Sequence, residues 1–444
     1  MLSRLLILLL LLPAAARAMD IAAVLQLAEQ HDAGWQAAQA QYRAARENEN
    51  LGDAALLPQI GFSAFSSATS ASTRNSTSAA SPNGDTRFGA SGYSLDLSQT
   101  LYNQALFEAA EAESLRSAAA LATLEAARQD LYLRVATAYF DLLGKQDALA
   151  FARAEQHAIG RQLEQYRERF EAGLVSITDV TDSRAQFDLA VANTIVAEND
   201  LHNSRENLRL LIKQPVDEVA GLHSELPLLS PEPDDITAWQ QTALDNNLQL
   251  RAKRYLLQAA SRDLASSRAG HYPTLSLNAR HSFTRSGGST VSNAFSGRDL
   301  SENRLTLNLD IPVYSGGATS AAARQKRALR DAAQAQLEQQ QRLAIQQVRS
   351  AFLNIKASIA QVKALRQAVA STRSATEAAQ LGFESGTRNS IDVLLAQREQ
   401  FASENRYARA RYDYLLNVLK LKRAAGTLSA QDLHHTNRFL AAAK

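Results

Sequence analysis

Apolar residues recur at helical spacing over most of the chain. Examples near its two ends are Ile21, Val24, Leu25 and Ala28, and Tyr407, Ala410, Tyr414, Val418 and Leu421. No proline lies between Pro82 and Pro215, and none follows Pro312. Because proline breaks a helix interior, we expect two long helical stretches, from about Gln104 to Leu211 and from about Ala318 to Ala425.

Four short segments alternate apolar and polar residues with a period of two. Their apolar positions are Ile60, Phe62 and Ala64; Tyr93, Leu95, Leu97 and Leu101; Leu275, Leu277, Ala279 and Phe283; and Leu305, Leu307, Leu309, Ile311 and Val313. Strands of about 10 residues with one apolar and one polar face are typical of a transmembrane barrel with a wet interior. We expect a long polar loop inside each pair of strands, over 66–87 and 284–303.

One motif occurs twice, 213 positions apart. The copies run from Phe170 to Val180 and from Phe383 to Val393, and Phe, Glu, Gly, Asp and Val recur in register. Each copy lies between two predicted helices, and its glycine can take the positive φ that lets one helix end and the next reverse direction. We therefore expect two helical hairpins with these motifs at their tips.

The duplication extends beyond the tips, because Leu57-Pro58-Gln59-Ile60 matches Tyr272-Pro273-Thr274-Leu275 at a similar offset. At about 1.5 Å per residue, the returning helix of a hairpin and an upper helix placed end to end have the length of one long helix. The link between the two copies should therefore lie halfway along the long helices, beside the C-terminal tail. The expected divisions are a signal peptide (1–18); an upper helix (19–55), a β-hairpin (56–102) and a helical hairpin (103–213, tip 171–178); an equatorial link (214–235); a second upper helix (236–270), β-hairpin (271–315) and helical hairpin (316–425, tip 384–390); and an equatorial tail (426–444).

The first 18 residues have the pattern of a secretory signal peptide. Arg4 precedes an apolar run from Leu5 to Leu12, and the segment ends in Ala16-Arg17-Ala18. That run is too short to span a bilayer as a helix, and no later stretch reaches the about 18 apolar residues required. We expect cleavage after Ala18 and export of the mature chain.

The amino-acid composition excludes several kinds of site and partner. There is no cysteine, which removes disulfides, thiolate metal ligands and a cysteine lipid anchor. The 47 basic residues less Arg4 and Arg17 leave 45, against 45 acidic residues, so the mature chain is balanced. A nucleic-acid binder would carry a basic face, and we expect no nucleic-acid partner.

Four strands cannot close a barrel by themselves. Small closed barrels need about eight strands, and an open edge in lipid leaves backbone groups unpaired. A dimer would have eight strands and a filled lumen, whereas a trimer would have twelve and an open pore. Long polar helices would serve little purpose beneath a filled barrel, which favours the trimer.

The chain resembles the TolC family of outer-membrane efflux and secretion ducts. The two tips carry the resemblance, with Leu57-Pro58-Gln59, Val313-Tyr314-Ser315-Gly316-Gly317 and Arg411-Tyr412-Asp413-Tyr414-Leu415. It implies a homotrimer with a twelve-stranded outer-membrane β-barrel continuous with a long periplasmic α-helical barrel. It also implies a periplasmic adaptor protein and an inner-membrane pump of ABC or RND type as partners.

The resemblance also implies a gate at the hairpin tips. Thr178 and Asp179 match the acceptors that close the periplasmic mouth, and Arg388 matches their basic partner. Phe383 stands where the family has a gate tyrosine, so a hydroxyl bond is missing. The simpler alternative for Arg388 and Asp179 is a solvated charge pair worth under about 1 kcal/mol.

Three further assignments come from the same resemblance. Asp392 matches an acidic ring facing the lumen, for which a solvated helix face is the alternative. The family has a second acidic ring three residues later, where this chain has Leu395. Binding of cations in the lumen should therefore be weaker. The pairs Gly173-Leu174 and Gly386-Thr387 match the turns that meet the adaptor, although both glycines are also needed for the turns themselves.

No motif indicates catalysis, a cofactor or a metal site. His434-His435 is the only histidine pair, and the chain contains no H-E-x-x-H sequence and no G-x-S-x-G elbow. The sequence therefore predicts a passive exit duct for efflux or type I secretion, and leaves its cargo, pump and adaptor unnamed. The alternatives are a periplasmic coiled-coil adaptor or structural protein without a membrane barrel, and a general porin.

Overall fold

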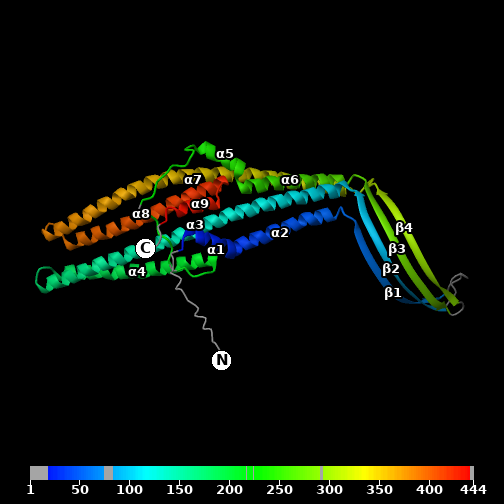
Figure 1. Ribbon diagram of the computed structural model, residues 1–444, viewed down its shortest axis with the longest axis horizontal. Helices are drawn as coiled ribbons and strands as arrows, with labels where there is room; N and C mark the ends of the chain where they lie inside the picture. The colour runs from blue at the N-terminus through cyan, green and yellow to red at the C-terminus, as the bar shows by residue number, and fades with distance from the viewer. Residues whose placement is uncertain (1–18, 75–83, 217, 224, 291–293, 441–444) are drawn as a thin grey trace, which may run out of the picture. The chain divides into compact units, whose positions relative to one another are not determined.

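The computed structural model describes residues 19–74, 84–216, 218–223, 225–290 and 294–440, so the predicted signal peptide lies outside the described residues. The elements in this part of the chain are α1 (Ile21–His31), α2 (Ala33–Ala54), β1 (Gln59–Thr73), β2 (Gly84–Tyr102), α3 (Gln104–Glu171), α4 (Ile177–Ile212), α5 (Ile236–Asn246), α6 (Leu248–Ala269), β3 (Thr274–Thr290), β4 (Ala294–Asp310), α7 (Ala318–Glu384), α8 (Ser390–Ala425) and α9 (Ala430–Asn437) (Figure 1).

The chain forms two compact units. One contains residues 41–121 and 252–338, and the other contains the remaining three segments, up to 40, 122–251 and from 339 onward. Helices α2, α3, α6 and α7 contribute residues to both. The β-strands all belong to the first of these units, which we call the sheet unit, and both hairpin tips belong to the other, the hairpin unit.

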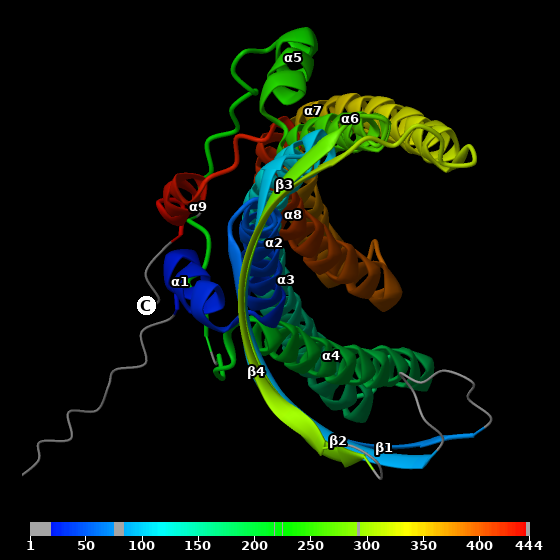
Figure 2. The ribbon, with the colours of Figure 1, turned by 90° about the vertical axis from the view of Figure 1, so that its right-hand side faces the viewer.

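The sheet unit contains a curved antiparallel sheet with the strand order β1-β2-β3-β4 (Figure 2). Phe62 pairs with Leu95, and Leu277 pairs with Leu307, so apolar residues of neighbouring strands share one face. That face is open in the single chain, since the side chain of Leu305 is 74% exposed. The sheet therefore presents an apolar surface of the kind that lipid covers.

The strands are longer than the sequence pattern predicted. Most of the two expected polar loops, 66–87 and 284–303, is paired strand, and 75–83 lies outside the described residues. The loop assignment was wrong because polar residues can also pair across strands. Arg285 and Asp299, for example, form two hydrogen bonds of 2.8 and 2.9 Å between β3 and β4.

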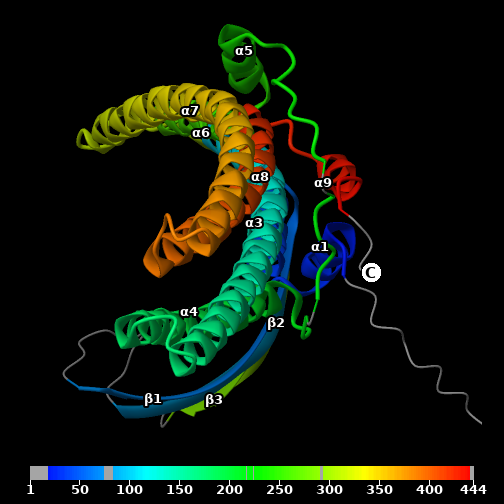
Figure 3. The ribbon, with the colours of Figure 1, turned by 90° about the vertical axis from the view of Figure 1, so that its left-hand side faces the viewer.

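In the hairpin unit, α4 returns beside the last part of α3, and α8 returns beside the last part of α7 (Figure 3). The two hairpins are joined where α4 contacts α8. Helix α1 packs against α4, and α9 packs against α1. None of the helices in the described ranges combines the length and apolarity that a bilayer-spanning helix needs.

The two segments predicted as single upper helices are each broken once. Asp32 separates α1 from α2, and Asn247 separates α5 from α6. Each side chain accepts a hydrogen bond from the backbone N–H three residues later, as helix-capping residues do. Asp32 also binds the guanidinium of Arg134 at 2.8 and 2.9 Å, and Asn247 donates to the carbonyl of Ala424 at 2.9 Å. The helical period of apolar residues continues through both breaks, and only the capping residues mark them.

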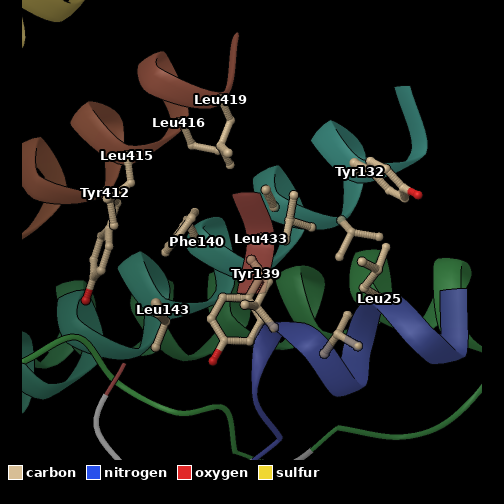
Figure 4. Close-up of a cluster of buried hydrophobic side chains, with 14 of the residues drawn as sticks. Leu25, Tyr132, Tyr139, Phe140, Leu143, Tyr412, Leu415, Leu416, Leu419 and Leu433 are labelled. Atoms are coloured by element: carbon tan, nitrogen blue, oxygen red, sulfur yellow. The ribbon is translucent and has the colours of Figure 1, made fainter. Parts of the chain in front are cut away.

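The core of the hairpin unit is built around adjacent aromatic residues of α3. Tyr139 and Phe140 are fully buried, and the ring of Tyr412 stacks on Phe140 with centroids 5.9 Å apart. Figure 4 shows these rings among leucines from α1, α3, α8 and α9. Burial of each large apolar side chain stabilises the fold by about 1.5–3 kcal/mol. The hydroxyl of Tyr139 donates to the carbonyl of Ala220 at 2.8 Å, which fixes the link to this core.

Helix α8 ends where it meets the break between α5 and α6. Its C-cap is Gly426, with φ of 78°. A Cβ at this position would lie 2.3 Å from the carbonyl oxygen of Asn246. Glycine is therefore required twice, for the left-handed backbone and for the close approach.

Candidate functional site

The first hairpin tip joins α3 to α4 through a short turn. Gly173 has φ of 72°, and its N–H donates to the carbonyl of Phe170 at 2.9 Å. Ser176 is the N-cap of α4. The backbone N–H of Ser176 donates a hydrogen bond to the carboxylate of Asp179 at 3.1 Å. Asp179 therefore completes a capping box and stabilises the start of α4.

The second tip repeats this construction between α7 and α8. Gly386 has φ of 74°, and its N–H donates to the carbonyl of Phe383 at 3.0 Å. The side chain of Asn389 accepts from the N–H of Asp392 at 2.8 Å, and Asp392 accepts from the N–H of Asn389 at 3.3 Å. The matched aspartates of the two copies thus occupy the same capping position.

A hydrogen bond between the start of α4 and the start of α8 connects the two tips. The hydroxyl of Ser390, the first residue of α8, donates to the carboxylate of Asp179 at 2.8 Å. Ser390 is only 2% exposed. A hydrogen bond to an ionised acceptor is among the stronger ones in proteins, especially where water is excluded.

Tyr166 of α3 extends this contact. Its buried hydroxyl accepts from the amide of Gln162 at 2.9 Å and interacts with the hydroxyl of Ser390. Burial raises the pKa of Tyr166, against smaller opposing effects of its hydrogen bonds with Gln162 and Ser390, and the nearby carboxylate of Asp179 adds a still smaller upward effect. Since it accepts from Gln162, the oxygen of Tyr166 is an acceptor in this cluster, while the hydroxyl of Ser390 donates to Asp179.

Phe383 packs against the same group. Its ring lies edge-on to the ring of Tyr166, with centroids 5.5 Å apart, and the guanidinium of Arg169 lies 5.2 Å from the Phe383 centroid. Aromatic and cation–π contacts of this kind contribute about 0.5–1.5 kcal/mol each. Phe383, which lacks the hydroxyl expected from the resemblance, thus holds the tips through packing.

The remaining predicted gate residues lie nearby without making the expected pair. The hydroxyl of Thr178 contacts that of Ser176 in the α4 cap. Arg388 and Asp179, both within the described residues, form no ion pair inside one chain. A Cβ on Gly382 would lie 3.0 Å from the Cγ of Arg388, so the arginine stem packs over this glycine.

Leu174 of the first predicted docking turn and Leu395, at the position of the family's second acidic ring, are exposed to solvent. Leu174 is 74% exposed, and Leu395 is 53% exposed. The hydroxyl of Thr387 is held inward, because it donates to the carbonyl of Gly382 at 3.0 Å. Among the described residues, no cluster of histidine and acidic side chains could hold a metal ion.

Sequence reasoning missed Tyr166, Gln162, Ser390 and Arg169. One signal was available, since Tyr166 precedes the first tip by four residues and the matching position of the second copy is Ala379. A large polar side chain on one copy alone indicates a role that the repeat does not share. The two capping boxes also have a sequence pattern, Ser176-x-x-Asp179 and Asn389-x-x-Asp392.

Comparisons with known proteins identify the class. The model of the outer membrane efflux protein family matches residues 24–212 and 239–427. Outer membrane protein TolC of Vibrio cholerae is 36% identical over 350 residues, which are 79% of this chain and 80% of that protein. The alkaline protease secretion protein AprF of Pseudomonas aeruginosa is 27% identical over 419 residues, 92% of this chain and 84% of AprF.

Solved structures share the fold. The CmeC outer membrane channel of Campylobacter jejuni superimposes with a TM-score of 0.79 at 16% identity, over 95% of this chain and 90% of CmeC. The chain belongs to the outer membrane efflux protein family. The resemblance seen in the sequence is confirmed, and so is the expected class, an outer-membrane exit duct for efflux and type I secretion. This sets aside the periplasmic adaptor and the general porin.

Proposed function

We propose that three copies of this chain form the duct. The three sheets close a twelve-stranded barrel in the outer membrane, and the hairpins form a periplasmic helical barrel. The signal peptide is cleaved after Ala18, and the chain divides into the two copies, link and tail expected from the sequence. The single observation that carries the proposal is the open sheet, whose apolar face and two edge strands β1 and β4 have no partner within the described part of the chain. In lipid, unpaired edges cost several kcal/mol per backbone group.

The gate is formed by the two hairpin tips. Within each subunit, the hydrogen bond from Ser390 to Asp179 and the contact of Ser390 with the Tyr166 hydroxyl hold the tips together. Between subunits, Arg388 reaches Asp179 or Thr178 of its neighbour and completes the closure. Each of these contacts contributes about 1 kcal/mol, so a few kcal/mol separate closed from open, which a docking partner can supply.

The partners are a periplasmic adaptor protein and an inner-membrane pump. Gly173, Leu174, Gly386 and Thr387 form the adaptor-facing turns, and Asp392 forms an acidic ring in the lumen. The family, described by efflux, and the relative AprF, named for protease secretion, support both kinds of cargo. The duct itself is passive, and the pump supplies the energy.

Purified protein tests the duct directly. We expect a mass of three chains in detergent, from light scattering, and a small conductance in planar lipid bilayers. A protein that stays monomeric and soluble without detergent would overturn the proposal. Asp179→Ala combined with Arg388→Ser should raise the conductance, and an unchanged value would contradict the gate but leave the duct intact.

A further inference from the structure

The polar face of the sheet carries two arginines in directly opposite positions. Arg280 of β3 pairs with Arg304 of β4 in the strand register, so their Cα atoms lie about 4.5–5.5 Å apart. Leu305 follows Arg304 and lies on the apolar face, and successive residues of a strand alternate between faces. Both arginines therefore belong to the face opposite the exposed leucines. Like charges in directly opposite positions destabilise a strand pair, so this arrangement needs a reason.

Each of the two arginines has a carboxylate of its own. Nε of Arg280 lies 3.4 Å from Oδ1 of Asp96 on β2, farther than the about 2.7–3.2 Å of an ordinary hydrogen bond. Arg304 donates to one oxygen of Glu302 at 2.5 and 3.1 Å. Asp96 also accepts from the hydroxyl of Ser94 at 2.7 Å. Among the described residues, no carboxylate contacts both guanidinium groups, so the pair lacks a shared acceptor.

Solvent reaches both guanidinium groups. The side chains of Arg280 and Arg304 are 58% and 67% exposed. A guanidinium group has five N–H donors, and those of Arg280 make no short hydrogen bond to Asp96. Two neighbouring guanidinium groups with donors to spare can bind one oxyanion through several charge-assisted hydrogen bonds.

The first copy of the repeat has no charge at the matching place. The offsets that align the apolar positions, 215 for β1 with β3 and 212 for β2 with β4, match Arg280 to Phe65 and Arg304 to Gly92. Phe65 and Gly92 are also directly opposite each other, so the matched pairs occupy the same place in the two β-hairpins. A Cβ on Gly92 would lie 3.1 Å from the ring of Phe65. An uncharged pair thus satisfies this fold, and the arginines of the second copy need an explanation outside it.

We propose that Arg280 and Arg304 bind the carboxylate, sulfate or phosphate groups of anionic solutes that leave through the barrel. The inference rests on the proposed function, because closure of three sheets makes their polar face the wall of a lumen. Three such pairs then line that wall. Each site is weak, since its arginines are exposed and have carboxylate partners, and a pore needs weak sites because a bound solute must also leave. The pairs favour anionic over cationic cargo at the exit.

A soluble anionic dye tests the site. The trisulfonated dye pyranine is mixed with the full-length protein in neutral detergent, and binding is measured by fluorescence anisotropy. We expect the dye to bind, inorganic pyrophosphate to displace it, and added salt to weaken it. A wild-type protein that leaves the anisotropy of the dye unchanged would overturn the site.

The first copy provides the substitutions. Arg280→Phe with Arg304→Gly takes the pair that the same fold already carries, and should weaken dye binding at least about tenfold. The control is Arg285→Gln with Arg87→Gln, which removes the same charge from the opposite face of the sheet and should change binding less than about twofold. Equal losses in the two variants would overturn the site. A loss in the control alone would also overturn it, in favour of an anion at the face that contacts lipid.

Removal of the competing carboxylates gives a prediction of the opposite sign. Asp96→Asn frees Arg280 and Glu302→Gln frees Arg304, so the double variant should bind the dye about three- to tenfold more tightly. Damage to the sheet would weaken binding instead, and unchanged or weaker binding would contradict the arginine pair.

The mass of the protein in detergent reports the duct separately, because the arginine pair lies within one chain. A monomer that binds the dye would overturn the duct and leave the anion site intact. A trimer whose arginine variant binds the dye as the wild type does would overturn the anion site and leave the duct intact.

Discussion

The hydroxyl of Ser390 donates to the carboxylate of Asp179 at 2.8 Å, across 211 positions of sequence. The bond connects the first turn of α8 to the first turn of α4, and so connects the two copies of the repeated motif. Asp179 is at once a helix cap and the acceptor of this contact. A change at Ser390 can therefore loosen the tips without removing the cap that holds α4.

Removal of the Ser390 hydroxyl should open the gate. Ser390→Ala deletes the bond between the tips at a cost of about 1 kcal/mol per chain, so the closed state loses stability and single-channel conductance should rise. Ser385→Ala is the matched control, since the Ser385 hydroxyl binds only within its own turn. Similar conductance in both variants would contradict a role for the contact between the tips.

Tyr166 should act through the same contact. Tyr166→Phe removes one hydroxyl and keeps the ring that packs on Phe383. Because the hydroxyls of Tyr166 and Ser390 interact, the effects of Tyr166→Phe and Ser390→Ala on conductance should not be additive. The four conductances of this double-mutant cycle provide the measurement, and strict additivity would show that the two hydroxyls act independently.

Gly426 should be intolerant of a side chain. Gly426→Ala places a Cβ against the carbonyl of Asn246 and forces alanine into a left-handed backbone, so we expect a loss of at least about 2 kcal/mol. Gly221→Ala is the control, because a Cβ there meets nothing within 4 Å and its φ is not positive. Thermal unfolding followed by circular dichroism should separate the two, and equal midpoints would contradict the close approach.

The stabilities contributed by Asp32, which is buried, and by Asp147, which is half-buried, should depend on pH in opposite directions. Burial raises the pKa of Asp32, but hydrogen bonds from Arg134 and the backbone outweigh it and leave the pKa below 3.8. Burial raises the pKa of Asp147 above 3.8, against the smaller effects of Tyr412 and Arg411. The stability from Asp32 is thus present above about pH 4 and is lost as pH falls through its lowered pKa, whereas that from Asp147 is complete below pH 3.8 and is lost as pH rises through its raised pKa.

Asparagine substitutions test those signs. Asp32→Asn should destabilise the protein by about 1–2 kcal/mol at pH 7, and less at pH 3. Asp147→Asn removes a buried charge and leaves an acceptor for Tyr412, so it should be neutral or stabilising at pH 7. Urea unfolding at a series of pH values provides the comparison. The same pH trend in both variants would contradict the opposite shifts in pKa.

The two faces of the sheet should tolerate charge differently. Leu305 lies on the apolar face, and Thr306 is its neighbour on the other face. Leu305→Arg should cost about 2–4 kcal/mol if its position is deep in lipid, and should reduce the protein recovered in membranes. Thr306→Arg should assemble normally, and equal recovery of the two variants would contradict lipid contact of the apolar face.

Much of the fold could be predicted from the sequence alone. Long stretches without proline and with apolar residues at helical spacing predicted α3, α4, α7 and α8, because residues three and four apart share one face of a helix. The strands were recognised by alternation but assigned too short, since pairing of polar residues such as Arg285 and Asp299 depends on the partner strand. The breaks at Asp32 and Asn247 were missed, although both are capping residues.

The sequence by itself determined the duplicated plan, the two turns and the family, because these depend on local periods and on residues such as Gly173 and Gly386 that a turn requires. Only the tertiary structure decided which residues contact one another at the tips. Tyr166, Ser390 and Asp179 come from three different helices, and no spacing along the chain relates them. Their hydrogen bonds exist because the two hairpins pack side by side, and this packing is fixed by the fold of the hairpin unit as a whole.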